Sequence, residues 1–382
     1  MHKFGFIIHP IEYEDVSRKF KIMNKLPRRF VEGFTRMLPP LKVSEITGVK
    51  SKYAETEGYF VAVPLISNQM MSLPEDYVMK KIIKAGKIAE NLGAEIVGLG
   101  ALTSVVGDAG FTVAKNLNIA VTTGNSYTIA TAIEGTKKAA ELMGKDIRDS
   151  EVVVIGATGS IGKVCAEILS REAKYMTLVA RNKQKLEDFS RYLLEKTGMA
   201  ARVTSDVKEA LKSADIVVTV TSAVDTIIKP EYLKPGAVVC DVARPRDVSK
   251  EVADARDDVL VIEGGVVEVP GDVDFHFNFG FPPKTSYACM AETMILAMEG
   301  RIENYSLGRD LTVEQVDTIA KLAKKHGFKL GGFRSFERAV SEETIENVRK
   351  NAARRLKGNR FSTAEISHLK IFRAINQLIY IV

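Results

Sequence analysis

The chain has 382 residues, of which 46% are hydrophobic and 27% charged, and its formal net charge is +6. At about 150 residues per domain, this length corresponds to two or three globular domains. The 28 glycines and 12 prolines are spread along the chain, so the composition excludes a collagen-like or low-complexity protein. We expect the chain to fold throughout.

The cysteines and the N-terminus predict the cellular compartment of the protein. Cys165, Cys240 and Cys289 are too few and too scattered for a disulfide framework, and no CxxC or Cys/His cluster suggests a metal site. The apolar run Phe4–Ile8 is too short for the core of a signal peptide, and no apolar span reaches the roughly 18 residues that a membrane helix needs. We therefore expect a cytoplasmic protein without a metal.

The first region of the chain alternates apolar runs with helical patterns. This alternation is typical of an α/β domain, which we predict over residues 1–145 with its boundary in Gly144–Ser150. In chain order the pattern predicts strands at 4–8 and 59–65, a helix at 75–91, strands at 94–102 and 118–122, and a helix at 127–143.

From Glu151 the alternation becomes regular. Short β-branched runs separated by helices of about three turns indicate βαβ units, and hence a Rossmann-type, doubly wound parallel sheet over residues 146–284. The predicted strands are 151–155, 176–180, 201–204, 215–221, 237–241 and 259–262, and the predicted helices are 161–171, 183–196 and 207–212.

After Pro282-Pro283 the strand pattern stops, and residues 285–382 are predicted as a C-terminal helical region. Thr312 and Gln315 have capping-box spacing, and Gly327 stands where a helix-ending glycine belongs. These residues bound a helix at 313–326, which follows one at 286–300 and precedes one or two beyond Ser341.

The last part of this region, from about residue 331, is a basic extension. Residues 331–382 contain 10 Lys or Arg and 5 Asp or Glu. Such a segment either is a solvated helix face or meets an acidic partner or an anionic membrane surface. Its amphipathic end, His368–Val382, is too short to span a bilayer and fits three roles: peripheral membrane contact, partner contact, or docking on its own domain. No helix-turn-helix or zinc pattern suggests nucleic acid.

A glycine-rich turn joins the first strand of the middle region to its first helix. Gly156, Gly159 and Gly162 are spaced so that the backbone approaches a pyrophosphate and the helix N-terminus offers N–H groups to it. This context predicts a dinucleotide site, in which Thr158, Ser160 and Ile161 share the turn with the glycines.

The end of the second strand predicts which dinucleotide is bound. An acidic residue at this point would bind the ribose 2′-hydroxyl of NAD, but the chain has Arg181, Asn182 and Lys183 instead. Arg181 and the following lysines suit the 2′-phosphate of NADPH through charge-assisted hydrogen bonds. The predicted cofactor is therefore NADPH.

Among the three cysteines, Cys289 is the candidate nucleophile. Cys165 and Cys240 fall on apolar faces and are predicted to be inert core thiols. Cys289 follows Thr285 and Ser286, either of which can cap a helix, so it falls in the first helical turn. A helix N-terminus stabilises a thiolate and thereby lowers the pKa of the thiol, although small thiols also pack inertly under helices.

Several segments resemble the long-chain acyl-[acyl-carrier-protein] reductases of cyanobacteria, which form aldehydes and lie within the shikimate-dehydrogenase-like Rossmann superfamily. The resemblance covers residues from about 4 to about 328. Its main segment is Ala288-Cys289-Met-Ala-Glu292-Thr-Met-Ile-Leu296, continuing to Arg309, and it is joined in order by 122–125, 156–162 and 263–268.

The resemblance implies a function. In that family the cysteine that matches Cys289 takes the acyl group from acyl carrier protein or coenzyme A as a thioester, and NADPH reduces it to an aldehyde. It also implies that the N-terminal domain binds the acyl substrate. Two departures stand out: Tyr127 replaces a histidine of the family, and the chain runs about 50 residues past the family's usual end.

Two other functions remain open. One is a shikimate-dehydrogenase-like oxidoreductase that transfers hydride directly to a small hydroxy or keto acid, although the substrate residues of such enzymes are not recognisable. The other is a non-catalytic NADP-binding regulator with a basic interaction tail. A glutamyl-tRNA-reductase-like enzyme is disfavoured because its cysteine precedes the Rossmann domain, whereas Cys289 follows it.

Overall fold

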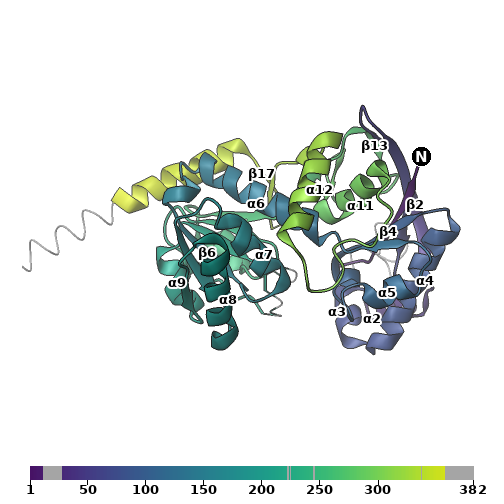
Figure 1. Ribbon diagram of the computed structural model, residues 1–382, viewed down its shortest axis with the longest axis horizontal. Coiled ribbons are helices and arrows are strands. Elements are labelled where there is room, and N and C mark those ends of the chain that lie inside the picture. The colour runs from purple at the N-terminus through teal and green to yellow at the C-terminus, as the bar shows by residue number, and fades with distance from the viewer. Residues whose placement is uncertain (12–27, 222, 224, 244–245, 337, 358–382) are drawn as a thin grey trace, which may run out of the picture. The chain divides into compact units, whose positions relative to one another are not determined.

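The computed structural model describes residues 1–11, 28–221, 223, 225–243, 246–336 and 338–357. These residues form two compact units, which are drawn in Figure 1. Unit 1 contains Met1–Gly135, Gly159–Ile168 and Gly264–Gly332. Unit 2 contains Thr136–Thr158, Leu169–Glu263 and the described residues from Phe333 onward. Each unit is therefore assembled from several stretches of the chain.

A six-stranded mixed sheet forms the centre of unit 1. Its order is β13-β2-β3-β1-β4-β5; β3, β1, β4 and β5 are parallel, whereas β2 is antiparallel to β3 and β13 to β2. The strands are β1 (Lys3–Ile8), β2 (Leu41–Lys50), β3 (Glu55–Ala62), β4 (Ile96–Leu99), β5 (Ala120–Thr122) and β13 (Gly271–Asp274).

Helices cover both faces of this sheet. One face, which includes Ile7 and Val97, packs against α4 and α5, and the other, which includes Phe6 and Phe60, packs against α11 and α12. The helices of this unit are α2 (Arg28–Met37), α3 (Ser67–Ser72), α4 (Glu75–Asn91), α5 (Phe111–Lys115), α11 (Ala288–Glu299) and α12 (Val313–His326). Helix α6 (Asn125–Leu142) begins in unit 1 and ends in unit 2.

Helix α11 packs closely against the sheet at Gly98. A Cβ added at Gly98 of β4 would lie 2.1 Å from Oγ1 of Thr293 on α11, so only glycine allows this approach. A small antiparallel sheet, β14-β12-β15, leads the chain into the helix. Its strands are β12 (Val266–Glu268), β14 (Thr285–Tyr287) and β15 (Lys329–Leu330).

Unit 2 is built on a six-stranded sheet in which every strand is parallel, in the order β11-β10-β9-β6-β7-β8. Counted from β6, this is the 3-2-1-4-5-6 order of a Rossmann fold. The strands are β6 (Glu151–Ile155), β7 (Tyr175–Val179), β8 (Arg202–Thr204), β9 (Ile216–Thr219), β10 (Val238–Asp241) and β11 (Leu260–Glu263). The helices between them in sequence are α7 (Ser160–Leu169), α8 (Lys183–Thr197), α9 (Val207–Ser213) and α10 (Lys250–Ala255).

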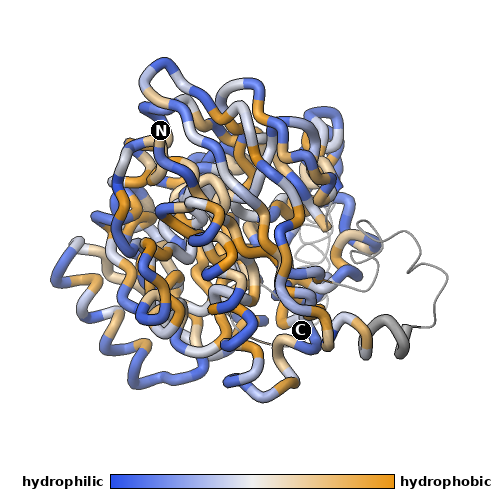
Figure 2. Tube along the Cα trace, turned by 90° about the vertical axis from the view of Figure 1, so that its right-hand side faces the viewer, coloured by the Kyte–Doolittle hydropathy of each residue, from blue (hydrophilic) through white to orange (hydrophobic). Residues whose placement is uncertain are grey.

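The hydrophobic residues follow this architecture. They gather along the central strands, whereas polar residues line outer helices and loops (Figure 2). All four residues of β9, β10 and β11 are buried, as expected for a parallel sheet that is covered on both faces. No helix among the described residues is long and apolar enough to cross a membrane.

The α/β class and the doubly wound parallel sheet predicted from the sequence are confirmed. Helices α4 and α12 have the predicted bounds, and the capping box of Thr312 with Gln315 and the left-handed Gly327 are both present. The predicted helices at 127–143 and 286–300 begin at Asn125 and Ala288.

The prediction that strands stop at Pro283 is wrong. Strands β14, β15, β16 (Phe333–Ser335) and β17 (Arg338–Val340) all follow it. Each has at most three residues and is held by its partner strand, so no long β-branched run marks it in the sequence. The division into three consecutive regions stays a prediction, and the compact units cut across it because α11 packs on β1, β3 and β4.

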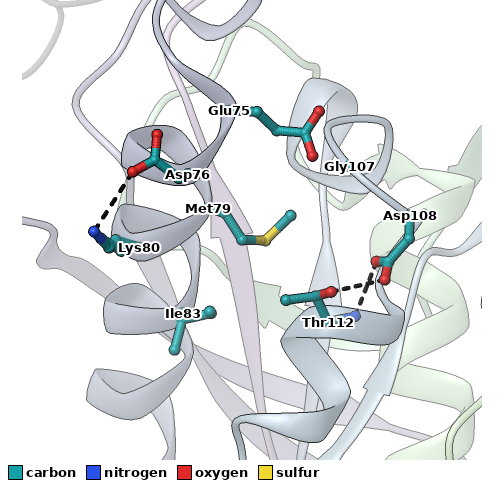
Figure 3. A pocket seen from close by; sticks show the side chains of 8 residues that line it. All are labelled: Glu75, Asp76, Met79, Lys80, Ile83, Gly107, Asp108 and Thr112. Atoms are coloured by element: carbon teal, nitrogen blue, oxygen red, sulfur yellow. Dashed lines mark hydrogen bonds and ion pairs between the residues drawn. The ribbon is translucent and has the colours of Figure 1, made fainter.

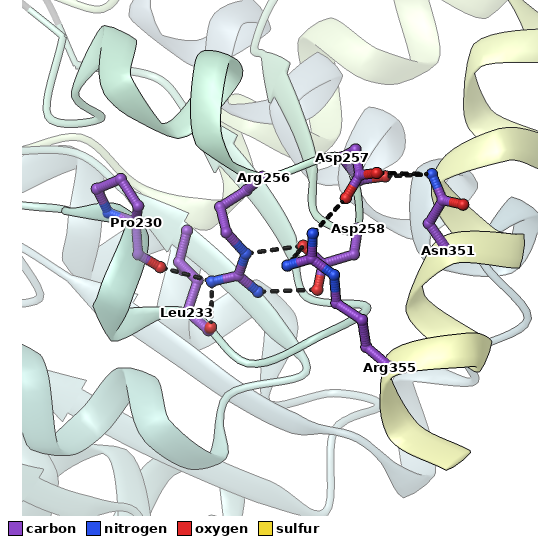
Figure 4. A network of polar contacts seen from close by, with 7 residues as sticks. All are labelled: Pro230, Leu233, Arg256, Asp257, Asp258, Asn351 and Arg355. Atoms are coloured by element: carbon purple, nitrogen blue, oxygen red, sulfur yellow. Dashed lines mark hydrogen bonds and ion pairs between the residues drawn. The ribbon is translucent and has the colours of Figure 1, made fainter. Parts of the chain in front are cut away.

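The described part of the basic extension docks on unit 2. Residues 342–357 are helical, and Asn351 and Arg355 bind Asp257 at 3.1 and 2.7 Å (Figure 4). Beneath them Asp258, whose side chain has no exposed surface, accepts two hydrogen bonds from Arg256 at 2.7 and 3.0 Å. The predicted amphipathic segment His368–Val382 lies outside the described residues.

This network predicts a stability difference between two neighbouring aspartates. Asp258→Ala is expected to lower the free energy of unfolding by about 3–5 kcal/mol in urea titrations, because it leaves the largely buried guanidinium of Arg256 without its carboxylate. Asp257→Ala is the control: its side chain is 62% exposed, and the expected loss is below about 1 kcal/mol. If both variants lost the same free energy of unfolding, Asp258 would not be the stabilising partner of Arg256.

Candidate functional site

The glycine turn lies at the switch point of the unit 2 sheet. Strand β6 ends at Ile155, and Gly156 has a φ of +83°. A Cβ at Gly156 would lie 2.9 Å from the carbonyl oxygen of Val220, which follows β9. Strands β6 and β9 are the neighbours between which the strand order reverses, and ligands of doubly wound sheets bind outside the carboxyl ends at that point. The turn thus has the glycine conformation and close backbone approach on which the predicted dinucleotide site depends.

A buried aspartate, missed by the sequence reasoning, fixes the edge of this switch point. The carboxylate of Asp247 accepts hydrogen bonds from the Oγ1 atoms of Thr219 and Thr221, both at 2.5 Å, and from the N–H of Thr221 at 3.0 Å. It therefore holds the segment that leaves β9 beside Gly156. The Thr-x-Thr pattern at a strand end was the available sign, but the aspartate follows it by 26 residues.

The residues predicted to select the cofactor lie beside this turn. The N–H groups of Gly156 and Ala157 donate to the carbonyl of Val179, two residues before Arg181. Arg181, Asn182 and Lys183 are all exposed, in the connection from β7 to α8 and at the start of α8. The Asn182 oxygen caps α8 by accepting from the N–H of Lys185 at 2.9 Å. Asn182 therefore has a structural task in addition to its predicted one.

The other predicted turn residues continue into α7. Ser160, Ile161 and Gly162 are its first three residues, and Gly159 directly precedes it. This is the strand, glycine turn and helix N-terminus that the sequence predicts for dinucleotide binding.

Cys289 is the second residue of α11 and is half-buried, whereas Cys165 and Cys240 are fully buried. The first turn of a helix is where a thiolate gains most from the helix dipole. The predicted cap is wrong: the residue before the helix is Tyr287, without a side-chain cap bond. Thr285 and Ser286 belong to β14 instead, and the hydroxyl of Thr285 donates to the carbonyl of Pro282.

A second segment presses against Cys289. A Cβ at Gly124, which has a φ of +74°, would lie 2.3 Å from both Cα and Cβ of Cys289. Gly124 ends the turn between β5 and α6 that the sequence resemblance singled out. The Thr-Thr-Gly-Asn segment and the cysteine, about 165 residues apart, therefore form one site within unit 1.

Glu292, three residues after Cys289, is the functional candidate that sequence reasoning missed. It has no exposed surface, and it accepts hydrogen bonds from Thr122 Oγ1 at 2.5 Å, Tyr127 N–H at 2.7 Å and Ser306 Oγ at 2.8 Å. Burial raises the pKa of Glu292, although these hydrogen bonds oppose the shift. Burial also raises the pKa of Tyr127, whose ring packs in the apolar cluster of the unit.

A ladder of aromatic rings leads toward Cys289. Its phenylalanines stand at every second position, which was the sign of it in the sequence. Rings of Phe275 and Phe279 are 5.0 Å apart, Phe279 and Phe281 5.4 Å, and Phe281 and Tyr287 4.4 Å. Phe277, Phe279 and Phe281 are partly exposed. The ladder ends on the residue that precedes α11 and thus offers an apolar path near the thiol.

An open groove elsewhere in unit 1 lacks such chemistry. It encloses about 560 Å³ between α4 and the start of α5 (Figure 3). Four of its polar residues pair with one another: Asp108 accepts from the N–H and hydroxyl of Thr112 at 2.9 and 2.7 Å, and Lys80 lies 3.5 Å from Asp76. No cysteine or histidine lines it. Cys289 and its surroundings are therefore the better candidate.

The amino-acid sequence of the chain is similar to those of several known proteins. The family profile described as Shikimate / quinate 5-dehydrogenase matches residues 137–263, which is the part that contains the glycine turn. The sheet order is that of a Rossmann unit, and the match shows that residues 137–263 resemble the corresponding part of this family of nicotinamide-dependent oxidoreductases.

Two curated proteins match most of the chain. The long-chain acyl-[acyl-carrier-protein] reductase of Synechococcus elongatus is 28% identical over 85% of this chain and 98% of its own length. Aminotransferase PigE of a Serratia species is 31% identical over 91% of this chain, but the chain spans only 42% of that protein. A bifunctional protein FolD of Listeria welshimeri matches 34% of the chain at 31% identity.

The contact between Gly124 and Cys289 predicts the effect of a single methyl group. Gly124→Ala is expected to displace the first turn of α11 and to slow alkylation of Cys289 by iodoacetamide about tenfold or more, followed by mass spectrometry. Gly93→Ala is the matched control, since Gly93 also has a positive φ, +86°, but nothing within 4 Å of an added Cβ. If both variants kept the wild-type rate, the close contact would have no role in positioning the thiol.

Proposed function

We propose that the chain is an NADPH-dependent reductase that converts a long-chain fatty acyl thioester, presented by acyl carrier protein or coenzyme A, into a fatty aldehyde. The observation that carries this proposal is the position of Cys289, the one incompletely buried cysteine of the three, in the first turn of α11 and against Gly124. The 28% identity to the Synechococcus reductase over nearly its whole length supports it.

The cofactor would be held by the glycine turn and the end of β7. Gly156, Thr158, Gly159, Ser160, Ile161 and Gly162 would surround the pyrophosphate, and Arg181 with Lys183 would bind the 2′-phosphate through charge-assisted hydrogen bonds. The exposed Arg181 has no acidic neighbour in the sequence, which favours NADPH over NADH. When bound, NADPH supplies the hydride that reduces the acyl group.

Cys289 performs the acyl transfer. Its thiolate attacks the carbonyl carbon of the donor thioester, a C–S bond forms to the protein, and the bond to the carrier sulfur breaks to release the carrier thiol. Reduction of this enzyme thioester breaks the new C–S bond, so that the aldehyde leaves and the thiol is restored. The N-terminus of α11 favours the thiolate in the first step and the oxyanion that develops at the carbonyl.

The aromatic ladder suits a fatty acyl chain. Phe277, Phe279 and Phe281 present partly exposed ring surface that continues to Tyr287, and thus to the residue next to the start of α11. An aliphatic chain that lies along these rings leaves water, which contributes about 0.8 kcal/mol per buried methylene. A small hydroxy acid, the substrate of the alternative shikimate-dehydrogenase-like reaction, would have no use for such a surface.

The alternative rests on the family profile, and that profile covers only residues 137–263. The profile therefore supports the binding of a nicotinamide cofactor but does not identify the substrate. The non-catalytic alternative requires NADPH binding without acyl transfer. The name of the Serratia relative describes a protein of which this chain spans 42%, so it assigns no activity to the shared part.

The first test isolates the acyl transfer. Wild-type protein mixed with palmitoyl-CoA or palmitoyl-ACP without NADPH is expected to gain one acyl mass by intact-protein mass spectrometry and to lose it when NADPH is added. Cys289→Ala is expected to gain none, while its NADPH affinity is unchanged. An adduct that persists in Cys289→Ala, or one that moves to Cys165, would refute the assignment; no adduct with any acyl donor would favour direct hydride transfer.

The second test concerns the cofactor. Arg181→Ala is expected to weaken NADPH binding by about 1.5–3 kcal/mol per lost charge-assisted hydrogen bond and to leave NADH binding nearly unchanged, as measured by fluorescence titration. Lys174→Ala is a charge-matched control, because Lys174 pairs with Asp149 near the start of β7, at the opposite end of that strand. If the two variants lost the same affinity, the effect would be one of net charge.

A further inference from the structure

Glu292 lies three residues after Cys289 on α11, with no exposed surface and with donors from two other segments around its carboxylate. We propose that Glu292 is a positioning residue, which ties the turn before α6 and the segment around Ser306 to α11 and so fixes the place of Cys289. The inference rests on the proposed function only in taking Cys289 as the reacting thiol.

The carboxylate of Glu292 caps the N-terminus of helix α6. Tyr127 is the third residue of α6, and its N–H is one of the groups that a helix leaves without a partner in its own backbone. Glu292 accepts this N–H through Oε2 at 2.7 Å. The N-terminus of one helix is thereby joined to the side of another, and both belong to unit 1 at this point.

A chain of contacts then runs from Glu292 back to the nucleophile. Thr122 Oγ1 donates to Oε1 of Glu292 at 2.5 Å and accepts the N–H of Gly124 at 3.2 Å. Gly124 is the residue whose backbone lies against Cys289. A shift of the Thr122 hydroxyl would therefore move the surface on which the cysteine rests.

The segment around Ser306 is held from the same centre. Ser306 has a φ of +55°, which a non-glycine residue adopts only when its surroundings enforce it. Its hydroxyl donates to Oε1 of Glu292 at 2.8 Å and lies 2.7 Å from Oγ of Ser126, while its carbonyl accepts from Thr123 Oγ1 at 2.5 Å. Glu292 is thus the common partner of these two segments, through three donors.

Two variants of similar length separate positioning from charge. In Glu292→Gln the amide oxygen can accept the Tyr127 N–H while its NH₂ group donates to the two hydroxyls, which rotate to accept. This amide resembles the neutral carboxyl, which the raised pKa of Glu292 favours, in having one oxygen that accepts and a second group that donates. Glu292→Met fills the same space without any acceptor, so the three donors lose their partner.

The measurement is the rate of acyl transfer to Cys289 from palmitoyl-CoA, followed by mass spectrometry, together with NADPH affinity. Glu292→Gln is expected to stay within about threefold of wild type, and Glu292→Met to lose about tenfold or more at saturating donor with little change in half-saturation. NADPH affinity is expected to stay unchanged in both variants. Equal rates for Gln and Met, whether both normal or both slow, would overturn the positioning role.

Two further measurements keep the test decisive. If Glu292→Met does not fold, Ser306→Ala removes one of the three donors and is expected to slow acyl transfer severalfold; an unchanged rate would count against the proposal. If wild type accepts no acyl donor, the proposed function fails separately, and the pH profile of Cys289 alkylation by iodoacetamide takes its place. In that experiment the pH profile of Glu292→Gln is expected to coincide with the wild-type profile, and the profile of Ser306→Ala is expected to shift along the pH axis. If all three profiles coincided, the positioning role of Glu292 would be refuted.

Discussion

The close approach of α11 to its surroundings is the constraint on which the candidate site depends. Gly98 admits Thr293 against β4, and Gly124 admits the backbone of Cys289, with added Cβ positions 2.1 and 2.3 Å from their neighbours. Both contacts exist only because a side chain is missing. The helix is therefore pressed against the sheet along one edge and against the turn before α6 at its start, which leaves the thiol little freedom of position.

A close contact that depends on a glycine also occurs at the switch point of the unit 2 sheet. Gly156 lets the turn after β6 approach the segment that leaves β9, and Asp247 holds that segment with three hydrogen bonds. In each unit a glycine provides the close contact and a buried carboxylate, Asp247 or Glu292, gathers the donors of the adjoining loop. A buried carboxylate that accepts several hydrogen bonds satisfies the donors of an irregular segment and thereby holds that segment in one conformation.

The sequence predicted the regular parts well, because their patterns are local. The helix 75–91, the strand 151–155 and the helix 313–326 have the predicted bounds, and each is marked by its own periodicity or cap. The strands β12 and β14 were missed because three residues cannot show a period. They form because they pair with each other in an antiparallel ladder, and such pairing between distant residues leaves no local pattern in the sequence.

The candidate site was predictable only in part for a related reason. Cys289 could be chosen because the sequence places it in the first turn of a helix, but its supposed caps, Thr285 and Ser286, are strand residues. Glu292 stands within the apolar stretch of α11, where an acidic residue suggests a solvent-facing position. Only the fold shows that it faces inward, toward Thr122 and Ser306.

This inward position also decides how the thiolate can be stabilised. A charged carboxylate one helical turn from Cys289 would oppose the thiolate, and the dipole at the start of α11 would have to overcome both its repulsion and its desolvation. Burial raises the pKa of Glu292 and so shifts its carboxyl toward the neutral form, which lessens this repulsion. The same burial that lets Glu292 hold the turn against the cysteine therefore also weakens the like charge beside it.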